Sequence, residues 1–592
     1  MCGIFGMIGQ NAVTNACTAL KLLEYRGYDS AGVAYKTDGV IKVVKTVGRV
    51  ERLAEILPED DFARIAIGHT RWATHGKVCQ ANAHPFYSAD KRFAVVHNGI
   101  IENYVDLKLK LTSAGVEFTS QTDSETVAHL LQKHYVDNVL HSVTSTAKEL
   151  GGAYAVVVTN AYDDKLYAIK NKSPLVVGVN GSGAYFCSDI RCISHFTDKV
   201  AVVPDKTVAV ADKNRVMFYD YDGEPVSVKF FEVDQTENTE TVDGDYMLKE
   251  IFEIPDKIRQ AKQGYIASGG LNLPYKTVHR LKRIYLIGCG TAYNSGLQVA
   301  AYARKMLNID VIPVIASEFI YDSYPVDSYT LAFFISQSGE TADTIRAAER
   351  VASLGGFTYA VTNTDNSSLS FTCDVTKNIY ADGEYAVAST KAYNCQLVTL
   401  TLLFADLAYL KGTLDDGARA KIYDAIDLLP AAVDKILANS YEIARIAEEV
   451  KDSSAVFFIG RTADYPVACE GSLKLKEISY IHSEAYPAGE LKHGTLALME
   501  QGVTVVTVAC DSALIDKTAL SIAEVVSRGA RVIAVSPYNF GNAELVNIPV
   551  VNKLLYGAVS VVPLQLLAYY VAKRLGRDVD KPRNLAKSVT VE

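Results

Sequence analysis

The sequence lacks the features of a disulfide-stapled secreted protein. Its ten cysteines are scattered along the chain without any CxxC pair, which is typical of reduced thiols in a cytosolic protein. The first residues, MCGIFGMIGQ, contain no basic segment followed by an apolar segment and a small-residue cleavage site. We therefore expect no secretory signal and a cytoplasmic location.

Long apolar and basic runs are also absent. The most apolar stretch, residues 556–572, contains Pro563 and Gln565 and is only about as long as the shortest membrane-spanning helices. We expect a buried helix there and no membrane association. The 59 Lys and Arg residues against 68 Asp and Glu residues give a net charge of −9, with no basic run that could follow a phosphate backbone. Nucleic acid is therefore not an expected partner.

A metal site is not expected either. Four histidines, His69, His75, His84 and His97, lie near one another in the sequence. Their spacing matches no ordinary zinc pattern, and the nearby cysteines are unpaired. We therefore predict no metal.

What the sequence does contain is enough chain for several domains. Its 592 residues, at about 150 residues per domain, predict about four globular units. Up to about residue 234, short β-rich runs alternate with Gly-containing turns, which indicates stacked sheets with helices at 12–23 and 124–134. The polar, acidic stretch QTENTETVDGD at 235–245 predicts a linker.

Beyond this linker, strands alternate with long helical patterns, and the pattern occurs twice. RIYLIGCGTAY, from Arg283, is similar to AVFFIGRTADY, from Ala455, and a second pair of segments follows at nearly the same offset of about 172 residues. Matched elements in the same order predict tandem, doubly wound α/β domains. The predicted boundaries are 1–234 for the first domain, 235–250 for the linker, 251–425 and 426–575 for the repeats, and 576–592 for an extended tail.

Cys2 directly follows the initiator Met1. Removal of Met1 would leave a thiol and a free α-amine on one residue, and an α-amine with an unperturbed pKa of about 7.7–8.0 could accept the thiol proton. By itself, a cysteine at position 2 is more often an incidental small residue, so the neighbouring motifs must decide.

Those motifs are CGIFG, YRGYDSAG (25–32), GHTRWATHG (68–76), HNGIIEN (97–103) and TDSE (122–125). In this order they resemble the glutaminase domain of amino-terminal-nucleophile amidotransferases. The resemblance implies an αββα sandwich in which Cys2 attacks the side-chain amide of glutamine and ammonia leaves.

The residue types in these motifs suit a free amino acid. Arg71 offers a fork of donors for the α-carboxylate, and Asp123 offers the opposite charge to the α-ammonium. The resemblance adds further roles: Thr74 and His75 as glutamine ligands, Asn98 and Gly99 as the oxyanion hole, and Trp72 as an ammonia gate. Two alternatives stay open, a simple turn at Asn98-Gly99 and a core aromatic at Trp72, the only tryptophan.

In the duplicated half, SQSGET (336–341) follows an apolar strand and opens a helical pattern. Backbone N–H groups and hydroxyls at such a turn suit a phosphate, although a Ser-rich helix cap is the alternative, and no Walker motif is present. The segment resembles sugar-isomerase (SIS) domains. The resemblance implies a phosphosugar site made of Thr291, Ser336, Gln337, Ser338, Thr341, Val387, Ser389, Lys474 and Ala586.

Lys474 and Glu477 are three residues apart, so on a helix they share one face; a surface ion pair is the alternative. The resemblance implies that Glu477 moves a proton between C1 and C2 of the open-chain sugar, that His493 opens the ring, and that Lys587 forms a Schiff base. A lysine in a polar tail is normally solvated, so the role of Lys587 depends on the resemblance. His482 is taken as structural.

The order of these segments over the whole chain resembles the family of isomerising glutamine:fructose-6-phosphate aminotransferases. This implies conversion of glutamine and fructose 6-phosphate to glutamate and glucosamine 6-phosphate, the first step of hexosamine biosynthesis. It also implies no pyridoxal cofactor and no metal, and a homodimer through the SIS domains, with the ring-opening histidine supplied by the neighbouring subunit. Ala292 departs from the family, where Ser is common.

Two other functions stay possible at this point. An amidotransferase with another acceptor, such as phosphoribosyl pyrophosphate, would carry an acidic pyrophosphate-binding motif, and a phosphosugar-sensing regulator would carry a helix-turn-helix segment. We find neither in the sequence.

Overall fold

The computed structural model describes residues 2–58, 61–72, 76–233 and 244–589. The chain forms two compact units. One comprises the chain up to Thr241 together with the residues from Ser588, and the other runs from Val242 to Lys587. Each unit is described below by itself.

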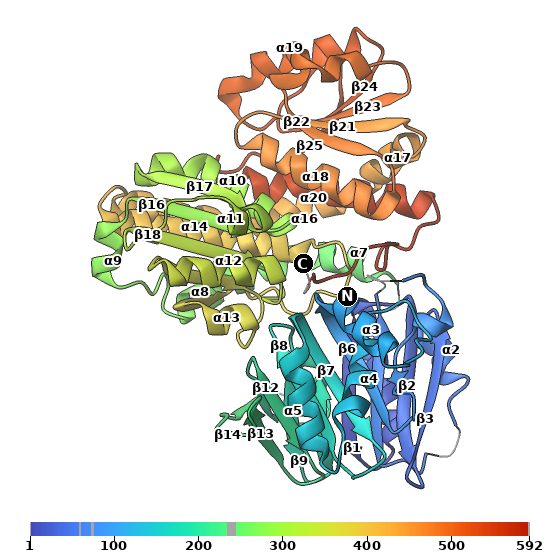
Figure 1. Ribbon diagram of the computed structural model, residues 1–592. Coiled ribbons are helices and arrows are strands. Elements are labelled where there is room, and N and C mark those ends of the chain that lie inside the picture. Colours follow the sequence, from blue (N-terminus) through green and yellow to red (C-terminus); the bar gives the residue numbers. More distant parts are fainter. Residues whose placement is uncertain (1, 59–60, 73–75, 234–243, 590–592) are drawn as a thin grey trace. The chain divides into compact units, whose positions relative to one another are not determined.

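The first unit is built on two sheets (Figure 1). One has eight strands in the order β15-β11-β9-β10-β1-β4-β2-β3, and the other has seven in the order β14-β13-β12-β8-β7-β6-β5. The strands of the first sheet are β1 (Gly3–Gly9), β2 (Ser30–Thr37), β3 (Val40–Val47), β4 (Ile65–Arg71), β9 (Val176–Asn180), β10 (Gly183–Cys187), β11 (Lys199–Val202) and β15 (Phe231–Glu232). Those of the second are β5 (Phe86–Tyr87), β6 (Phe93–Ile101), β7 (Gly152–Asn160), β8 (Leu166–Asn171), β12 (Thr207–Ala211), β13 (Val216–Asp220) and β14 (Pro225–Val226).

The two sheets pack face to face, and helices cover both outer faces. Ile4 and Ile67 of one sheet share a buried core with Val96 and Val157 of the other, as expected where apolar residues alternate along strands. The helices are α1 (Ala12–Leu23), α2 (Val50–Ala54), α3 (Tyr104–Ser113), α4 (Glu125–His134), α5 (Val139–Glu149) and α6 (Ile190–Ile193). Because α1 joins the core on one outer face and α3 to α5 join that on the other, the predicted αββα sandwich is confirmed, as are both predicted helices.

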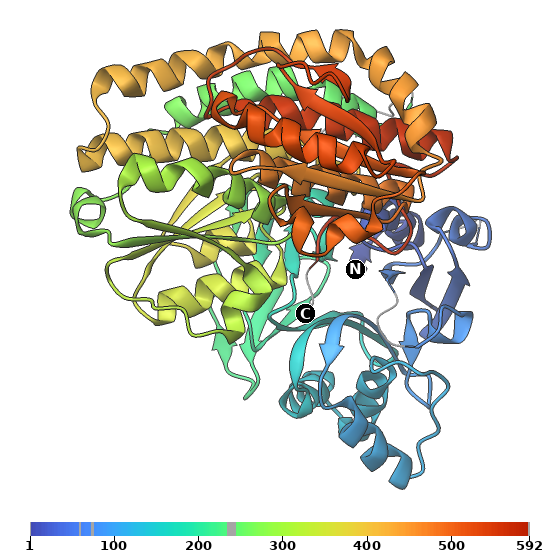
Figure 2. The same ribbon diagram turned by 90° about the horizontal axis from the view of Figure 1, so that it is seen from above.

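The second unit contains two five-stranded parallel sheets with the same strand order, β17-β16-β18-β19-β20 and β22-β21-β23-β24-β25. The first is made of β16 (Arg283–Gly288), β17 (Asp310–Ile315), β18 (Thr330–Ser336), β19 (Phe357–Thr362) and β20 (Val375–Asn378). The second is made of β21 (Ala455–Gly460), β22 (Ser483–Pro487), β23 (Val503–Val508), β24 (Arg531–Ser536) and β25 (Glu544–Asn547). The predicted tandem α/β domains are therefore confirmed, and Figure 2 shows their sheets as separate yellow-green and orange groups of arrows.

Helices surround these sheets. They are α7 (Tyr246–Phe252), α8 (Ile254–Ala267), α9 (Tyr275–Arg280), α10 (Thr291–Leu307), α11 (Ala316–Tyr321), α12 (Ala342–Ser353), α13 (Ser368–Thr372), α14 (Lys391–Lys411), α15 (Asp416–Asp427), α16 (Leu429–Ala438), α17 (Ser440–Val450), α18 (Asp464–Ser479), α19 (Ile515–Val526) and α20 (Tyr556–Arg574). Helix α20 is buried along most of its length with Pro563 inside it, so the predicted buried helix is confirmed. Across the described ranges, no helix has both the length and the apolar character needed to cross a bilayer.

The start of the second unit differs from the sequence prediction. Residues 246–250, expected to belong to the linker, lie in α7, because Met247 and Ile251 are buried against the unit's core. The carboxylate of Asp580 accepts the backbone N–H groups of Tyr246 and Met247, at 2.9 and 2.8 Å, and so stabilises the first turn of α7. Residues 234–243 lie outside the described part of the chain.

Candidate active site

Cys2 lies at the beginning of β1, facing the end of β4. Its Sγ accepts the backbone N–H of Trp72 at 3.3 Å and lies 3.5 Å from the Trp72 carbonyl oxygen. Burial raises the pKa of the Cys2 thiol, while the Trp72 N–H and the Arg71 guanidinium lower it and Asp123 raises it. Because both charged side chains act on the thiol, the structure gathers Cys2, Arg71 and Asp123 in one place.

Arg71 and Asp123 present opposite charges beside this thiol. Arg71 ends β4 with a buried side chain whose guanidinium donates to the carbonyl oxygens of Gly76 and Lys77, at 3.4 and 3.5 Å. The Asp123 carboxylate accepts the backbone N–H of Ile101 at 2.9 Å. An α-carboxylate and an α-ammonium suit this pair of charges. The predicted ligands Thr74 and His75 lie outside the described residues.

The predicted oxyanion hole lies at the end of β6. Asn98 donates its Nδ2 to the carbonyl oxygen of Cys2 at 2.9 Å, so the amide points its donor toward the nucleophile. Gly99 has φ +113°, and a Cβ at this position would lie 2.1 Å from the carbonyl oxygen of Ala153. Only glycine fits this backbone without strain. Asn98 and Gly99 both lie within β6 and pair with β7, so the simple-turn interpretation is wrong.

His69, on β4, fixes the orientation of the Asn98 amide. Its Nε2 lies 2.9 Å from the His97 carbonyl oxygen and 3.1 Å from Asn98 Oδ1. The His97 carbonyl can only accept, so Nε2 must carry the proton, and the amide oxygen must face it. Sequence reasoning considered His69 only as a metal ligand and missed this contact.

Burial keeps this histidine neutral. It lowers the pKa of His69 to about 3. The ring of His84 stacks on His69 at 3.9 Å between centroids, and burial and the neighbouring histidines also hold the pKa of His84 well below its usual value. In the described ranges, no group of three or more His, Cys, Asp or Glu side chains is arranged to hold a metal ion.

Trp72 is half-buried rather than enclosed in the core. Its ring meets that of Tyr28 edge-on, with 5.8 Å between centroids. A core aromatic is therefore the poorer interpretation. The backbone of Trp72, through its N–H group and carbonyl oxygen, is the part that contacts the Cys2 thiol.

The SQSGET segment forms the turn between β18 and α12, as predicted. Ser336 Oγ accepts the backbone N–H of Gly339 at 3.1 Å and lies 2.9 Å from Thr341 Oγ1. Gly339 has φ +68°, and a Cβ there would lie 2.1 Å from Ser367 Oγ. Gln337 and Ser338 are half-buried on the same turn. The turn is thus a preformed loop of hydroxyls and N–H groups at the start of a helix, which suits an anion.

The second repeat uses the corresponding turn differently. After β23, the backbone N–H groups of Cys510 and Asp511 donate to the carboxylate of Asp464, at 2.9 and 3.4 Å. This buried aspartate begins α18. The chain therefore supplies its own anion to this turn, and the duplication of the fold does not repeat the same arrangement of groups.

Helix α18 carries the predicted pair Lys474 and Glu477. Lys474 Nζ lies 2.6 Å from Glu477 Oε2, 3.0 Å from Thr291 Oγ1 and 3.5 Å from Glu470 Oε1. The Lys474 side chain is 1% exposed, so the surface-ion-pair interpretation is wrong. Although burial lowers the pKa of Lys474, Glu477 and Glu470 outweigh it and raise the pKa overall.

Glu470 is a site residue that the sequence interpretation missed. Its fully buried carboxylate accepts hydrogen bonds from Thr291 Oγ1 at 2.9 Å and Asn294 Nδ2 at 2.8 Å, and burial raises its pKa. The sequence does contain an indication of this residue, because Glu470 lies four residues before Lys474, which places both on one helix face. Ala292, where the family commonly has Ser, is buried in the first turn of α10 beside Thr291.

Lys587 is not a solvated tail lysine. Its side chain is 4% exposed and forms an ion pair with the buried carboxylate of Glu384. Glu384 also accepts a hydrogen bond from Ser389 Oγ at 2.9 Å and contributes to the raised pKa of Lys474. The structure therefore gathers Lys587, Ser389 and Lys474 around one carboxylate.

Four further residues were singled out in the sequence, namely Val387, Ala586, His493 and His482. Val387 is half-buried and donates its N–H to the carbonyl oxygen of Asp580 at 2.9 Å, and Ala586 is half-buried next to Lys587. His493 is exposed at the end of the 3₁₀-helix η3 (Glu490–His493). Within the described part of this single chain, no hydrogen bond or ion pair links His493 to Lys474 or Glu477. His482 is largely exposed beside Glu484.

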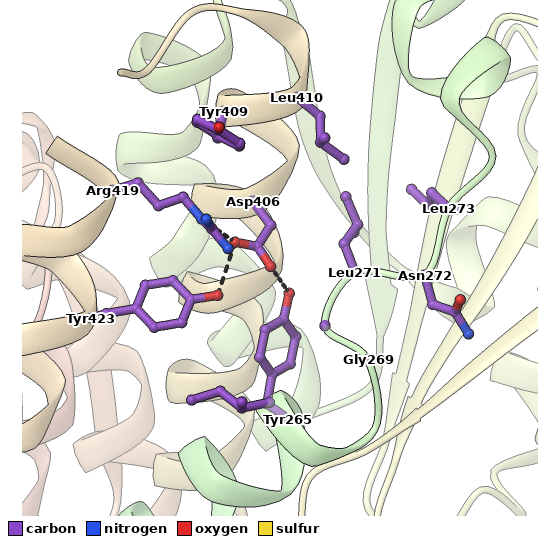
Figure 3. A pocket seen from close by; sticks show the side chains of 12 residues that line it. Tyr265, Gly269, Leu271, Asn272, Leu273, Asp406, Tyr409, Leu410, Arg419 and Tyr423 are labelled. Atoms are coloured by element: carbon purple, nitrogen blue, oxygen red, sulfur yellow. Dashed lines mark hydrogen bonds and ion pairs between the residues drawn. The ribbon is translucent and has the colours of Figure 1, made fainter. Parts of the chain in front are cut away.

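A separate cavity of about 470 Å³ lies among α8, α14 and α15 (Figure 3). Asp406 accepts hydrogen bonds there from Tyr265 Oη at 2.7 Å, Arg419 Nε at 2.7 Å and Tyr423 Oη at 2.8 Å. These donors satisfy the buried carboxylate, and none of the predicted site residues lines this cavity.

Comparison with known proteins decides the family. The model of the SIS domain matches residues 278–406 and 449–573, and the model of a glutamine amidotransferase domain matches residues 69–195. Along 100% of both chains, the sequence is 41% identical to the glutamine–fructose-6-phosphate aminotransferase (isomerizing) of Clostridium acetobutylicum and 42% identical to that of Caldanaerobacter subterraneus. The chain belongs to this family.

A solved structure of an aminotransferase supports the same assignment for the second unit. The C-terminal domain of glucosamine-fructose-6-phosphate aminotransferase from Francisella tularensis is 36% identical, with a TM-score of 0.56. The match covers 58% of this chain and 100% of that one. The second unit therefore has the fold of this aminotransferase domain.

Proposed function

We propose that this protein transfers the amide nitrogen of L-glutamine to D-fructose 6-phosphate with isomerisation, giving D-glucosamine 6-phosphate and L-glutamate at the first step of hexosamine biosynthesis. The observation that carries the proposal is the end-to-end match to isomerizing aminotransferases. The site geometry of each unit supports one half of the reaction.

In the first unit, glutamine binds with its α-carboxylate on Arg71 and its α-ammonium on Asp123, assisted by Thr74 and His75. After removal of Met1, the α-amine of Cys2 accepts the thiol proton and Sγ attacks the side-chain carbonyl. Asn98 Nδ2 and the Gly99 N–H then stabilise the oxyanion. Collapse expels ammonia and leaves a thioester, which water hydrolyses to glutamate.

In the second unit, the phosphate of fructose 6-phosphate binds the turn from Ser336 to Thr341. Lys587 forms an imine at C2, which ammonia displaces. Glu477, held by Lys474, then moves a proton from C1 to C2 to give the 2-amino aldose. One carboxylate that reaches both carbons suffices for this shift.

Several parts of this proposal extend beyond a single chain or a single site. Trp72 gates an internal passage that keeps ammonia away from bulk water. Two chains form a cytoplasmic homodimer through their SIS domains, and His493 opens the sugar ring in the neighbouring subunit. The domain boundaries 1–234, 251–425 and 426–575 and the tail 576–592 belong to the same proposal.

The test is to incubate purified protein with fructose 6-phosphate and glutamine labelled with ¹⁵N at the side-chain amide, and to analyse the products by mass spectrometry. We expect one labelled nitrogen in a hexosamine phosphate, with an equal amount of glutamate. Label that appears only as free ammonium would contradict the proposal.

A further inference from the structure

The ion pair between Lys587 and Glu384 is buried on both sides. The Lys587 side chain is 4% exposed and that of Glu384 is 0% exposed. Glu384 precedes the long helix α14, and Lys587 comes from the tail, about 200 residues later in the chain. A charged lysine this deeply buried requires a partner, since a lone ammonium loses its hydration.

The Glu384 carboxylate is held by further donors. Oε1 accepts the backbone N–H groups of Thr390 and Ala392, at 2.9 and 3.1 Å, and Oε2 accepts Ser389 Oγ at 2.9 Å. These groups form the amino-terminal end of α14, where the helix dipole favours a negative charge. Although burial raises the pKa of Glu384, Lys587 and these donors outweigh it and lower the pKa overall. Glu384 is therefore an anion at neutral pH.

The other charged groups near Glu384 leave it as the counter-ion of Lys587. Burial and the charge of Glu384 raise the pKa of Glu250 to about 8, so Glu250 is mainly neutral at pH 7. Lys391 pairs with Glu253 at 2.7 Å, and Lys474 pairs with Glu477 at 2.6 Å. In the part of the chain that the structure describes, the one ion pair of Lys587 is with Glu384.

A lysine that forms an imine needs a free electron pair on nitrogen, and an ammonium has none. We propose that Glu384 positions Lys587 and relays its proton, taking one proton from Nζ before attack on C2 of the ketose and returning it to the leaving oxygen. This inference rests on the proposed function, because it presupposes the imine at Lys587.

The relay balances atoms and charge. Glu384 Oε2 takes one proton from the Lys587 ammonium, and the freed electron pair forms the N–C2 bond as the C2=O π bond breaks. A second Nζ proton passes to the former carbonyl oxygen, giving a neutral carbinolamine. Glu384 then returns its proton to the hydroxyl, the C–O bond breaks and water leaves. The product is an iminium that carries the original positive charge, still beside the Glu384 carboxylate, so the ion pair persists.

The test traps this imine. Full-length protein is mixed with fructose 6-phosphate and cyanoborohydride, and the reduced adduct at Lys587 is quantified by peptide mass spectrometry between pH 7 and 9. We expect Glu384→Gln to lower the trapping rate at pH 7 about 100-fold, within the range of general-base effects. The rate should then rise about tenfold per pH unit, because solvent hydroxide must remove the proton from the Lys587 ammonium. The unsubstituted protein should show a nearly flat profile.

Glu250→Gln is the matched control, because it changes a neighbouring buried glutamate that is already mainly neutral. We expect its trapping rate to equal that of the unsubstituted protein at pH 7. The thermal transition of the second unit reports whether each variant is folded. If Glu384→Gln does not fold, Glu384→Asp carries the test, with about a tenfold lower rate and a flat pH profile expected.

The outcomes separate the two proposals. A folded Glu384→Gln protein with the normal trapping rate at pH 7 overturns the relay, as does a reduced rate that alkaline pH does not restore. The relay is also overturned if Glu384→Asp shows the normal trapping rate or a trapping rate that rises with pH. An adduct at a different lysine, or none in the unsubstituted protein while labelled nitrogen still reaches the sugar, overturns the assignment of Lys587 and leaves the overall reaction standing.

Discussion

His69 Nε2 donates a hydrogen bond to Asn98 Oδ1 over 3.1 Å, so that the Asn98 amide turns its NH₂ group toward Cys2. Here the tautomer of a buried, neutral imidazole decides the orientation. The proposed oxyanion hole therefore depends on His69, a residue that is not one of its two donors.

His69→Ala should reduce glutamine hydrolysis about 10- to 100-fold through kcat, with little change in KM. Without the imidazole the amide can rotate, and loss of one oxyanion donor costs about 10²–10³ in rate. Glutamate release under steady-state conditions measures the effect. His141→Gln, at an exposed position in α5 of the same unit, is the control, and an equal loss there would show that the effect is not specific to the amide.

Cys2→Ala should abolish glutamine-dependent synthesis, because the nucleophile is lost. Interconversion of fructose 6-phosphate and glucose 6-phosphate should persist, since the groups around Lys474 lie in the other unit. A coupled dehydrogenase assay measures the interconversion. Retained use of glutamine would remove Cys2 from the mechanism.

Glu477→Gln should reduce this sugar isomerisation by about 10²–10⁴-fold, the usual range for loss of a general base. Lys474 would keep its contact with Glu470, so we expect the fold and glutamine hydrolysis to be preserved. Proton exchange at C1 of the sugar in deuterated water, followed by NMR, measures the step directly. Unchanged exchange would assign the proton transfer to another group.

Asp464 should make the second unit less stable as pH rises. Burial raises its pKa to about 6 in the folded protein, against about 3.9 when unfolded. The folded state therefore binds more protons at this carboxyl between about pH 4 and 6. The contribution of Asp464 to stability is fully present below pH 4 and is lost as pH rises through 6, by about 2–3 kcal/mol.

Asp464→Asn should remove this part of the pH dependence, because its amide oxygen can still accept the N–H groups of Cys510 and Asp511. Urea midpoints of the second unit, measured from pH 4 to pH 7.5 for both proteins, provide the test. Parallel curves for the two proteins would show that Asp464 has no unusual proton affinity.

Parts of the candidate site could be predicted because they are local in sequence. The spacing of Lys474 and Glu477 placed both on one helix face, and a strand followed by SQSGET predicted a polar turn at a helix start. Glu384 could not be found in this way, since its partner Lys587 is distant in the chain and no periodic pattern connects them. The same holds for His69, whose role depends on the opposite sheet of the sandwich.

The sequence by itself determined the order of elements, the duplication and the residues able to carry out chemistry, because hydrophobic periodicity and turn residues act over short stretches of chain. Tertiary structure alone decided which of these groups are charged. Burial and partners from distant segments make His69 neutral, raise the pKa of Asp464 and Glu250, and keep Lys587 beside an anion, since proton affinity depends on lost hydration and nearby charge rather than on sequence neighbours.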